Sequence, residues 1–138
     1  MEGTYHHSID AKGRLFIPAR LREELGDPFY VTLSMGEYLS AYSRESWDMF
    51  KEKVRAMPKA KQVKMRSLFS NAGKCDLDGQ GRVLLPQNLR DKVGLTKNVT
   101  VVGAGVCVEF WDSETYKPVE EFETTPEYIA EVYLELDI

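Results

Sequence analysis

The sequence predicts an α+β fold, mainly β with short helices, in which two tandem β-α-β repeats are followed by a C-terminal helix. The stretch from Ser8 to Gly26 returns 68 positions later as Asp76 to Gly94, and a shared period means that both copies satisfy one geometry. Each copy runs from a polar turn through three apolar residues to a proline, and a basic segment separates the copies. The main identical pairs are Asp10/Asp78, Gly13/Gly81, Arg14/Arg82, Pro18/Pro86, Leu21/Leu89, Arg22/Arg90 and Gly26/Gly94.

This pattern divides the chain into four parts. We expect a first repeat at residues 5–47, a basic helical spacer at 48–72, a second repeat at 73–117 and an amphipathic helix at 124–138. A repeat of this size is too small to bury an adequate core by itself. The two repeats are therefore expected to pack against each other.

Each repeat is expected to begin with a turn, a strand and a short helix. Residues 2–7 are predicted to form a lead-in strand. Gly13 suits the positive φ of a tight turn, residues 15–17 are a short apolar run, and Pro18 suits the first position of a helix. The second repeat matches with Gly81, residues 83–85 and Pro86, and apolar residues four apart give each helix one buried face (Leu21 with Leu25, Leu89 with Val93).

A β-hairpin is predicted to close each repeat, because aromatic and β-branched runs flank a glycine turn. The predicted strands are residues 29–33 and 38–42 in the first repeat, and 98–102 and 106–111 in the second. A helix is predicted to follow each hairpin, with Ser43 and Ser113 as the N-caps.

The spacer is predicted to hold two helices. Apolar residues recur at helical spacing from Trp47 to Met57, Pro58 interrupts the pattern, and a second helix runs from Lys59 to about Phe69. Residues 51–66 contain seven basic side chains and one acidic side chain. This basic run is either a solvated face or a contact, with DNA or with the acidic half of a neighbouring subunit.

The C-terminal segment has the pattern of an amphipathic helix. Thr125 is a suitable N-cap and Pro126 a suitable first helical residue. One face carries Ile129, Val132, Tyr133 and Leu136, and the opposite face Glu127, Glu131 and Glu135. We expect the apolar face to cover the β core of its own chain or that of a neighbour.

Charge is unevenly divided along the chain. The net charge is −4 overall, but residues 1–74 contain 13 basic and 9 acidic side chains, whereas residues 75–138 contain 5 basic and 13 acidic ones. An anionic polymer is attracted to a positive region and repelled by a negative one. The division therefore indicates the first repeat as the nucleic-acid face.

The turn of the first repeat is the candidate binding site. Asp10 is expected to accept backbone N–H bonds of the turn or to pair with Arg14, which would hold the guanidinium in one direction while Lys12 and Arg14 project. The alternative is an ion pair that only stabilises the turn. That alternative is stronger in the second repeat, where Asp78 and Arg82 recur but Gln80 replaces the lysine.

Other kinds of site find little support. His6 and His7 are the only histidines, so a metal site would lack ligands, and Cys75 and Cys107 lack metal-site spacing and are expected to be free thiols. The glycines at 103 and 105 imitate a dinucleotide fingerprint, but Val108 replaces its third glycine. We therefore predict no cofactor, no small-molecule substrate and no enzymatic activity.

The sequence contains neither a run of apolar residues long enough to span a membrane nor the apolar core of a signal peptide. The expected location is the cytoplasm, in association with the nucleoid.

The pattern of Asp, two residues, Gly, Arg, three apolar residues and Pro resembles the SpoVT/AbrB family of transcription factors. Two copies joined by a basic helical spacer, over nearly the whole chain, resemble the MraZ family of bacteria. The resemblance implies a swapped-hairpin, double-psi-like β-barrel and a closed ring of subunits. It also implies that Lys12, Arg14 and Arg82 bind double-stranded DNA at direct repeats upstream of the division and cell-wall gene cluster.

A second function stays open at this point, namely an AbrB-type antitoxin or protein-binding module whose contact with DNA is secondary. Antitoxins of this type usually have one repeat and a disordered tail, whereas the tail here has helical periodicity. The regulator is therefore the leading prediction.

Overall fold

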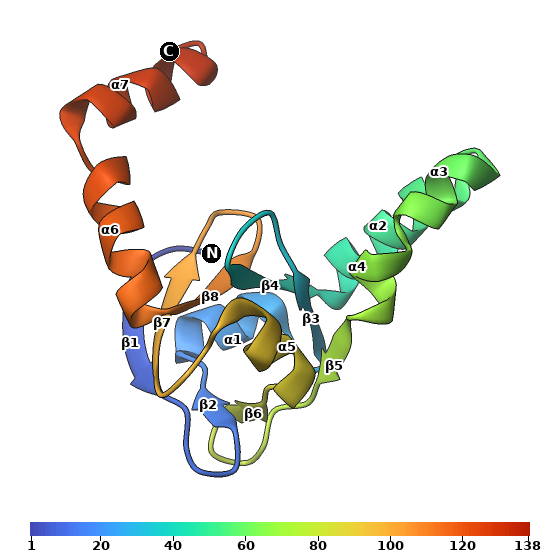
Figure 1. Ribbon diagram of the computed structural model, residues 1–138, viewed down its shortest axis with the longest axis horizontal. Coiled ribbons are helices and arrows are strands. Elements are labelled where there is room, and N and C mark those ends of the chain that lie inside the picture. The colour runs from blue at the N-terminus through green and yellow to red at the C-terminus, as the bar shows by residue number, and fades with distance from the viewer.

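The order of elements repeats, as the sequence predicts. The structure, a computed structural model, describes residues 1–138 (Figure 1). The first repeat contains β1 (Thr4–Ser8), β2 (Arg14–Phe16), α1 (Ala19–Leu25), β3 (Phe29–Leu33), β4 (Tyr38–Ser43) and α2 (Arg44–Arg55). After α3 (Lys59–Lys64) and α4 (Arg66–Ser70), the second repeat contains β5 (Gly73–Cys75), β6 (Arg82–Leu84), α5 (Gln87–Val93), β7 (Asn98–Gly103), β8 (Val108–Asp112) and α6 (Ser113–Glu123). The chain then forms α7 (Pro126–Glu135).

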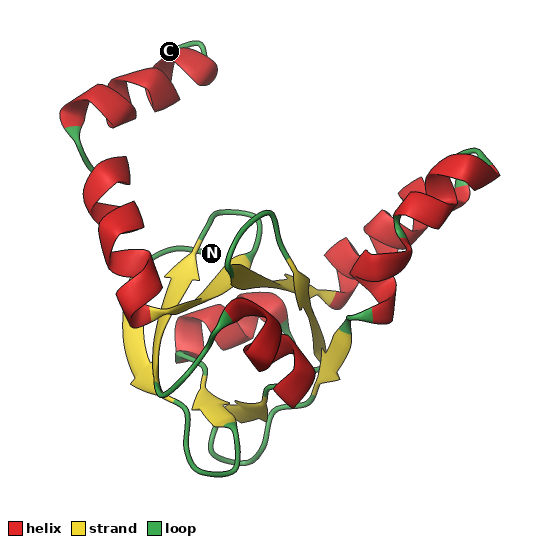
Figure 2. Ribbon diagram, in the orientation of Figure 1, coloured by secondary structure: helices red, strands yellow, loops and turns green.

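The two repeats are intertwined. A six-stranded antiparallel sheet has the order β1-β7-β8-β4-β3-β5, and β2 and β6 form a separate two-stranded ladder. The first strand of each repeat therefore pairs with the third strand of the other repeat, β1 with β7 and β5 with β3. The sheet curves around one side of the molecule and the β2–β6 ladder lies at the other (Figure 2). The fold is α+β as predicted. The ladders do not close into one barrel, although their arrangement is compatible with it.

Both repeats contribute to one core. Nineteen buried apolar side chains form a single cluster. Leu15 and Val83 from the β2–β6 ladder, and Leu21 and Leu89 from α1 and α5, have at most 1% of their surface exposed. Since each of these residues packs in a cluster shared with the other repeat, neither repeat has a complete core of its own.

The structure corrects two details of the predicted helix starts and confirms a third. Pro18 and Pro86 occupy the N-cap positions, one residue before the first helical residue. Ser43 caps α2 as predicted, with the Ser46 amide donating to its Oγ at 3.2 Å. The prediction for Ser113 is wrong, because Asp112 is the residue at the cap of α6 and its carboxylate accepts hydrogen bonds from Thr96 instead.

Two helical arms extend from the β body (Figure 1). The basic arm, residues 44–70, is a hairpin in which α2 leads outward and α3 and α4 return. The second helix of the spacer, predicted to be continuous, is divided at Met65, which ends α3 and caps α4. The acidic arm, residues 113–138, contains α6 and α7. None of the helices has the length and apolar character that a membrane span requires.

The C-terminal helix forms as predicted but does not cover its own core. Thr125 caps α7 by accepting a hydrogen bond from the Tyr128 amide at 3.3 Å, and Pro126 is the first helical residue. Because α6 carries α7 away from the sheet, α7 contacts mainly α6. Val132 is 39% exposed, and Leu136 is 63% exposed. The expectation that α7 covers its own core is therefore wrong, and a neighbour remains as its partner.

Candidate nucleic-acid interface

The turn between β1 and β2 is organised by one carboxylate. Asp10 Oδ1 accepts hydrogen bonds from the Lys12 and Arg14 amides, each at 2.9 Å. Its Oδ2 accepts from Arg14 Nε at 2.7 Å. The hydrogen bond from the Arg14 amide is the main cause that lowers the pKa of Asp10 from 3.8 to about 2, with the Arg14 guanidinium and the Lys12 amide adding to it against partial desolvation. Asp10 is therefore ionised at neutral pH and holds Arg14 in one direction.

The turn between β5 and β6 repeats this geometry. Asp78 Oδ1 accepts from the Gln80 and Arg82 amides at 2.9 Å, and its Oδ2 accepts from Arg82 Nε at 2.9 Å. The Arg82 amide is again the main cause that lowers the pKa of the carboxyl group. Both arginines are therefore oriented through Nε, and the Nη groups of Arg14 make no ion pair, so that they are available to a ligand.

Pairing of β2 with β6 brings the two turns side by side. In the ladder Arg14 is opposite Leu84 and Phe16 is opposite Arg82. Arg82 Nη1 lies 3.8 Å from Asp10 Oδ2, so an arginine of one repeat meets the carboxylate of the other. The turn surface, defined here as residues 10–14 and 78–82, is thus a single site. The two halves of the chain have opposite net charges, but their turns lie next to each other on this surface.

Two arginines that the sequence analysis left without a role support the turns. Arg90 in α5 lies below Gly13 of the first repeat, and Arg22 in α1 lies below Gly81 of the second repeat. Both glycines have positive φ, +85° and +76°, and a Cβ at either position would collide with the guanidinium beneath it. Arg90 is fixed in place by a 3.0 Å hydrogen bond from its Nε to the Leu85 carbonyl. The sequence offered one indication of this role, because Arg22 and Arg90 are the same residue type at equivalent positions of the two repeats.

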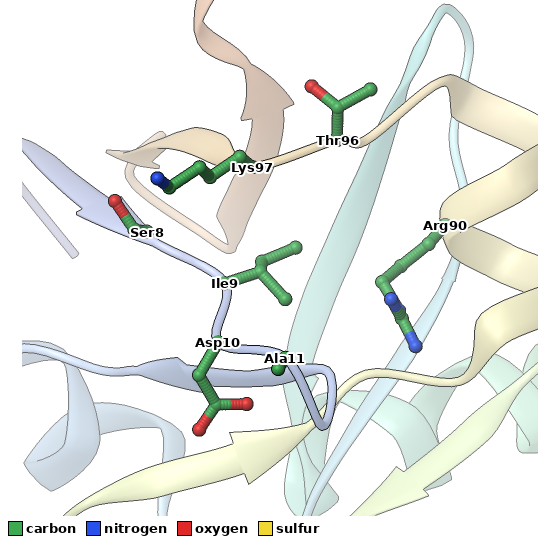
Figure 3. A pocket seen from close by; sticks show the side chains of 7 residues that line it. All are labelled: Ser8, Ile9, Asp10, Ala11, Arg90, Thr96 and Lys97. Carbon is green, nitrogen blue, oxygen red and sulfur yellow. The ribbon is translucent and has the colours of Figure 1, made fainter.

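A cleft opens beside the first turn (Figure 3). It has a volume of about 580 Å³ and is lined by Ser8, Ile9, Asp10, Ala11, Arg90, Thr96 and Lys97. In the close-up, Arg90 reaches toward the turn from one wall, while Lys97 lies near Ser8 at the other. The loop before β7 thereby adds an exposed lysine near the turn surface, which the sequence analysis did not assign to the site.

The remaining candidate groups serve other purposes. His6 Nδ1 lies 3.3 Å from the Thr100 hydroxyl, and no group of three or more metal-binding side chains is assembled anywhere in the protein. Cys75 and Cys107 are buried and free, and burial raises the pKa of Cys75 to about 12, so that it is a protonated thiol at neutral pH.

The fold and the turns define a class of protein, namely two intertwined β-α-β repeats that present a pair of Asp–Arg turns on one surface. The chain belongs to the MraZ family. The model of that family, described as "MraZ protein, putative antitoxin-like", matches residues 1–67 and 68–126.

Three curated relatives, each named transcriptional regulator MraZ, are similar over most or nearly all of their length. The relative from Heliobacterium modesticaldum is 41% identical over 99% of this chain and 98% of its own. The relative from Moorella thermoacetica is 43% identical over the same shares of the two chains. The relative from Carboxydothermus hydrogenoformans is 44% identical over 83% of this chain and 82% of its own.

Proposed function

We propose that this protein is a sequence-specific transcriptional regulator that binds double-stranded DNA at direct repeats upstream of the division and cell-wall gene cluster. The turn surface is the observation that carries the proposal, because it places two oriented arginines and an exposed lysine within one small area. The names of the curated relatives support the regulatory role. In this account the protein is not an enzyme.

The chemistry of the turn surface suits DNA. A guanidinium held through Nε keeps its outer N–H groups in a fixed plane, which matches a phosphate or the O6 and N7 edge of guanine. Lys12 is exposed and makes no ion pair, so it is available to a neighbouring phosphate. Arg14 and Lys12 are accordingly assigned the main contacts, and Arg82 a lesser one, because Arg82 is close to two carboxylates.

One turn surface is too small to hold DNA tightly by itself. It neutralises about one to three phosphates, which corresponds to weak binding at physiological salt. Several copies on one DNA would raise the affinity by effective concentration without new contacts. We therefore propose a closed ring of subunits, each of which presents its turn surface to one of a series of direct repeats.

The test is a gel-shift titration against the region upstream of the protein's own gene. Arg14→Ala is expected to weaken binding by about tenfold or more, since it removes a charged contact from every subunit. The matched control is Lys117→Ala, which removes the same charge from α6 on the acidic arm, remote from the turns. Equal affinities for Arg14→Ala and the control, with both variants folded, would overturn the assignment of the turn surface.

A further inference from the structure

The two arms carry opposite charge. The basic arm contains eight basic and three acidic side chains, a net charge of +5, whereas the acidic arm contains one basic and eight acidic side chains, a net charge of −7. Both arms leave the β body on the side away from the β2–β6 ladder (Figure 1). The arms of different copies are therefore free to approach each other while the turn surfaces stay exposed.

The acidic arm lacks a packing partner that the basic arm has. In the basic arm the returning helix covers α2, and the rings of Trp47 and Phe69 lie 5.3 Å apart. In the acidic arm no helix returns along α6, and α7 turns aside. Apolar side chains of the acidic arm therefore stay exposed to solvent. Phe122 of α6 is 67% exposed, and Tyr133 of α7 is 53% exposed. Exposed apolar side chains gathered on one charged arm indicate an interaction site.

A complementary cleft lies at the base of the basic arm, where α2 meets the β7–β8 turn. It has a volume of about 230 Å³ and is lined by Tyr42, Ser46, Met49, Phe50 and Val106. Met49 is 56% and Val106 80% exposed, although both are apolar. Lys53 follows Met49 by one turn of α2, so a cation continues the same face.

We propose that α7 of one copy docks by its apolar face into this cleft of a second copy. The contact would bury Val132 and Tyr133 of α7 against Met49, Phe50 and Val106, and the opposite net charges of the arms would bring the two surfaces together. A second copy is the favoured occupant, because the same chain supplies both an acidic arm with an open apolar face and a basic arm with an open apolar cleft.

The contact joins two unlike surfaces, so each copy offers one donor and one acceptor. Such head-to-tail contacts close into rings when the rotation between copies permits. This inference deepens the proposed function, since it names the interface that would assemble the ring, but its test does not involve DNA.

The first experiment measures the mass of the full chain by light scattering over a range of concentrations. Val132→Asp in α7 and Met49→Asp in the cleft are each expected to weaken assembly by about 100-fold, because each places a charge in the apolar contact. The control for α7 is Leu134→Asp, which changes an exposed residue on the other side of the same helix. The control for the cleft is Met35→Asp, which changes a residue that is 97% exposed at the β3–β4 turn. Both controls are expected to assemble like the wild type.

The second experiment mixes the Val132→Asp and Met49→Asp proteins, each of which is expected to be monomeric. The mixture retains one intact contact, between α7 of the Met49→Asp protein and the cleft of the Val132→Asp protein. We therefore expect heterodimers and no larger species. Because every changed residue is exposed or partly exposed, circular dichroism is expected to show wild-type folding for all four variants.

The remaining outcomes overturn the inference in distinguishable ways. A wild-type protein that is monomeric at all concentrations would overturn both this interface and the ring of the proposed function. A wild-type assembly that survives Val132→Asp and Met49→Asp would overturn the interface alone. If Val132→Asp alone abolished assembly and the mixture formed no heterodimer, α7 would contact a different surface of the second copy, and the proposed cleft would be wrong.

Discussion

At the scale of single residues, the turn surface depends on two carboxylates that are saturated with hydrogen bonds. Asp10 accepts from two backbone amides and one guanidinium, and Asp78 does the same. Both carboxylates are partly exposed, so their value lies in ordering the turn more than in stabilising the whole fold. An ordered turn keeps its arginine oriented before a ligand arrives, which lowers the entropy cost of binding.

The lowered pKa of Asp10 predicts a pH dependence. A carboxyl group whose pKa is lower in the folded state stabilises that state when ionised, so its contribution is present above about pH 5 and is lost as the pH falls through 3.8 toward 2. Asp10→Asn keeps the shape but not the charge. The difference in unfolding free energy between wild type and this variant is expected to be constant above about pH 5 and to shrink below pH 4. Urea unfolding at several pH values measures it, with Asp137→Asn at the exposed C-terminus as control. A difference that grew on acidification would contradict this reading.

Gly13 is expected to be required for two separate reasons. Gly13→Ala meets the strain of a positive φ and also displaces the Arg90 guanidinium, whereas Gly94→Ala, at a left-handed position with φ 68° and ψ 29°, meets only the positive φ, since nothing lies within 4 Å of its new Cβ. We expect Gly94→Ala to cost about 1 kcal/mol and Gly13→Ala about 1 kcal/mol more. Chemical denaturation of both variants measures the difference. Adding Arg90→Ala to Gly13→Ala should recover part of the loss, and equal costs for the two glycines would mean that Arg90 simply moves aside.

The two motif arginines are expected to be unequal in DNA binding. Arg14→Ala should reduce affinity more than Arg82→Ala, because Arg14 is accompanied by Lys12 and pairs with Asp10 alone, whereas Arg82 is accompanied by Gln80 and lies close to two carboxylates. Fluorescence anisotropy with one DNA probe at several salt concentrations measures both variants. Losses of the same size, with both proteins folded, would show that the companion charge is irrelevant.

At the scale of the elements, the swapped pairing makes each repeat depend on the other. β1 has its ladder partner in β7, β5 has its partner in β3, and β2 pairs only with β6. A single repeat would expose these strand edges and leave half of the apolar cluster open to water.

This dependence predicts the behaviour of fragments. Residues 1–71 and residues 72–138, expressed separately, should each be unfolded or aggregated, while a 1:1 mixture should regain the native structure. Circular dichroism and NMR spectra of the fragments and of the mixture make the comparison. A folded fragment 1–71 with dispersed NMR signals would contradict the intertwined core.

Much of this organisation could be predicted from the sequence, and the part that could not has a physical reason. The repeat of Asp10 through Gly26 identified the turns, strands and helices, because local geometry depends on nearby residues. It did not reveal that β1 pairs with β7, or that Arg22 and Arg90 lie under the other repeat's turns, because two equal copies allow pairing within or between repeats. The strand β5 was missed because its three residues have no clear alternation. The amphipathic pattern of residues 124–138 predicted the helix but not its partner.

At the scale of the whole molecule, charge is separated by surface and not only by chain half. The turn surface lies at one end of the β body and the two arms leave from the other side (Figure 1). A negative net charge therefore does not oppose DNA binding, since the acidic arm is distant from the turns and would face the basic arm of the next copy. Screening at physiological salt, with a Debye length of about 8 Å, limits the remaining repulsion.

The ring and the turn surface together predict how DNA affinity depends on the number of sites. Probes with one, two and three direct repeats, spaced by about 10 bp so that successive turns meet the same face of the DNA, provide the measurement. Affinity should rise steeply from one repeat to three, and the slope of log K against log salt should change by about −0.9 for each phosphate contacted. A probe with the spacing changed by half a turn should bind like a single repeat. If the single-repeat probe bound as tightly as the triple, or the half-turn shift made no difference, the proposal that a ring presents these turns to successive repeats would be contradicted.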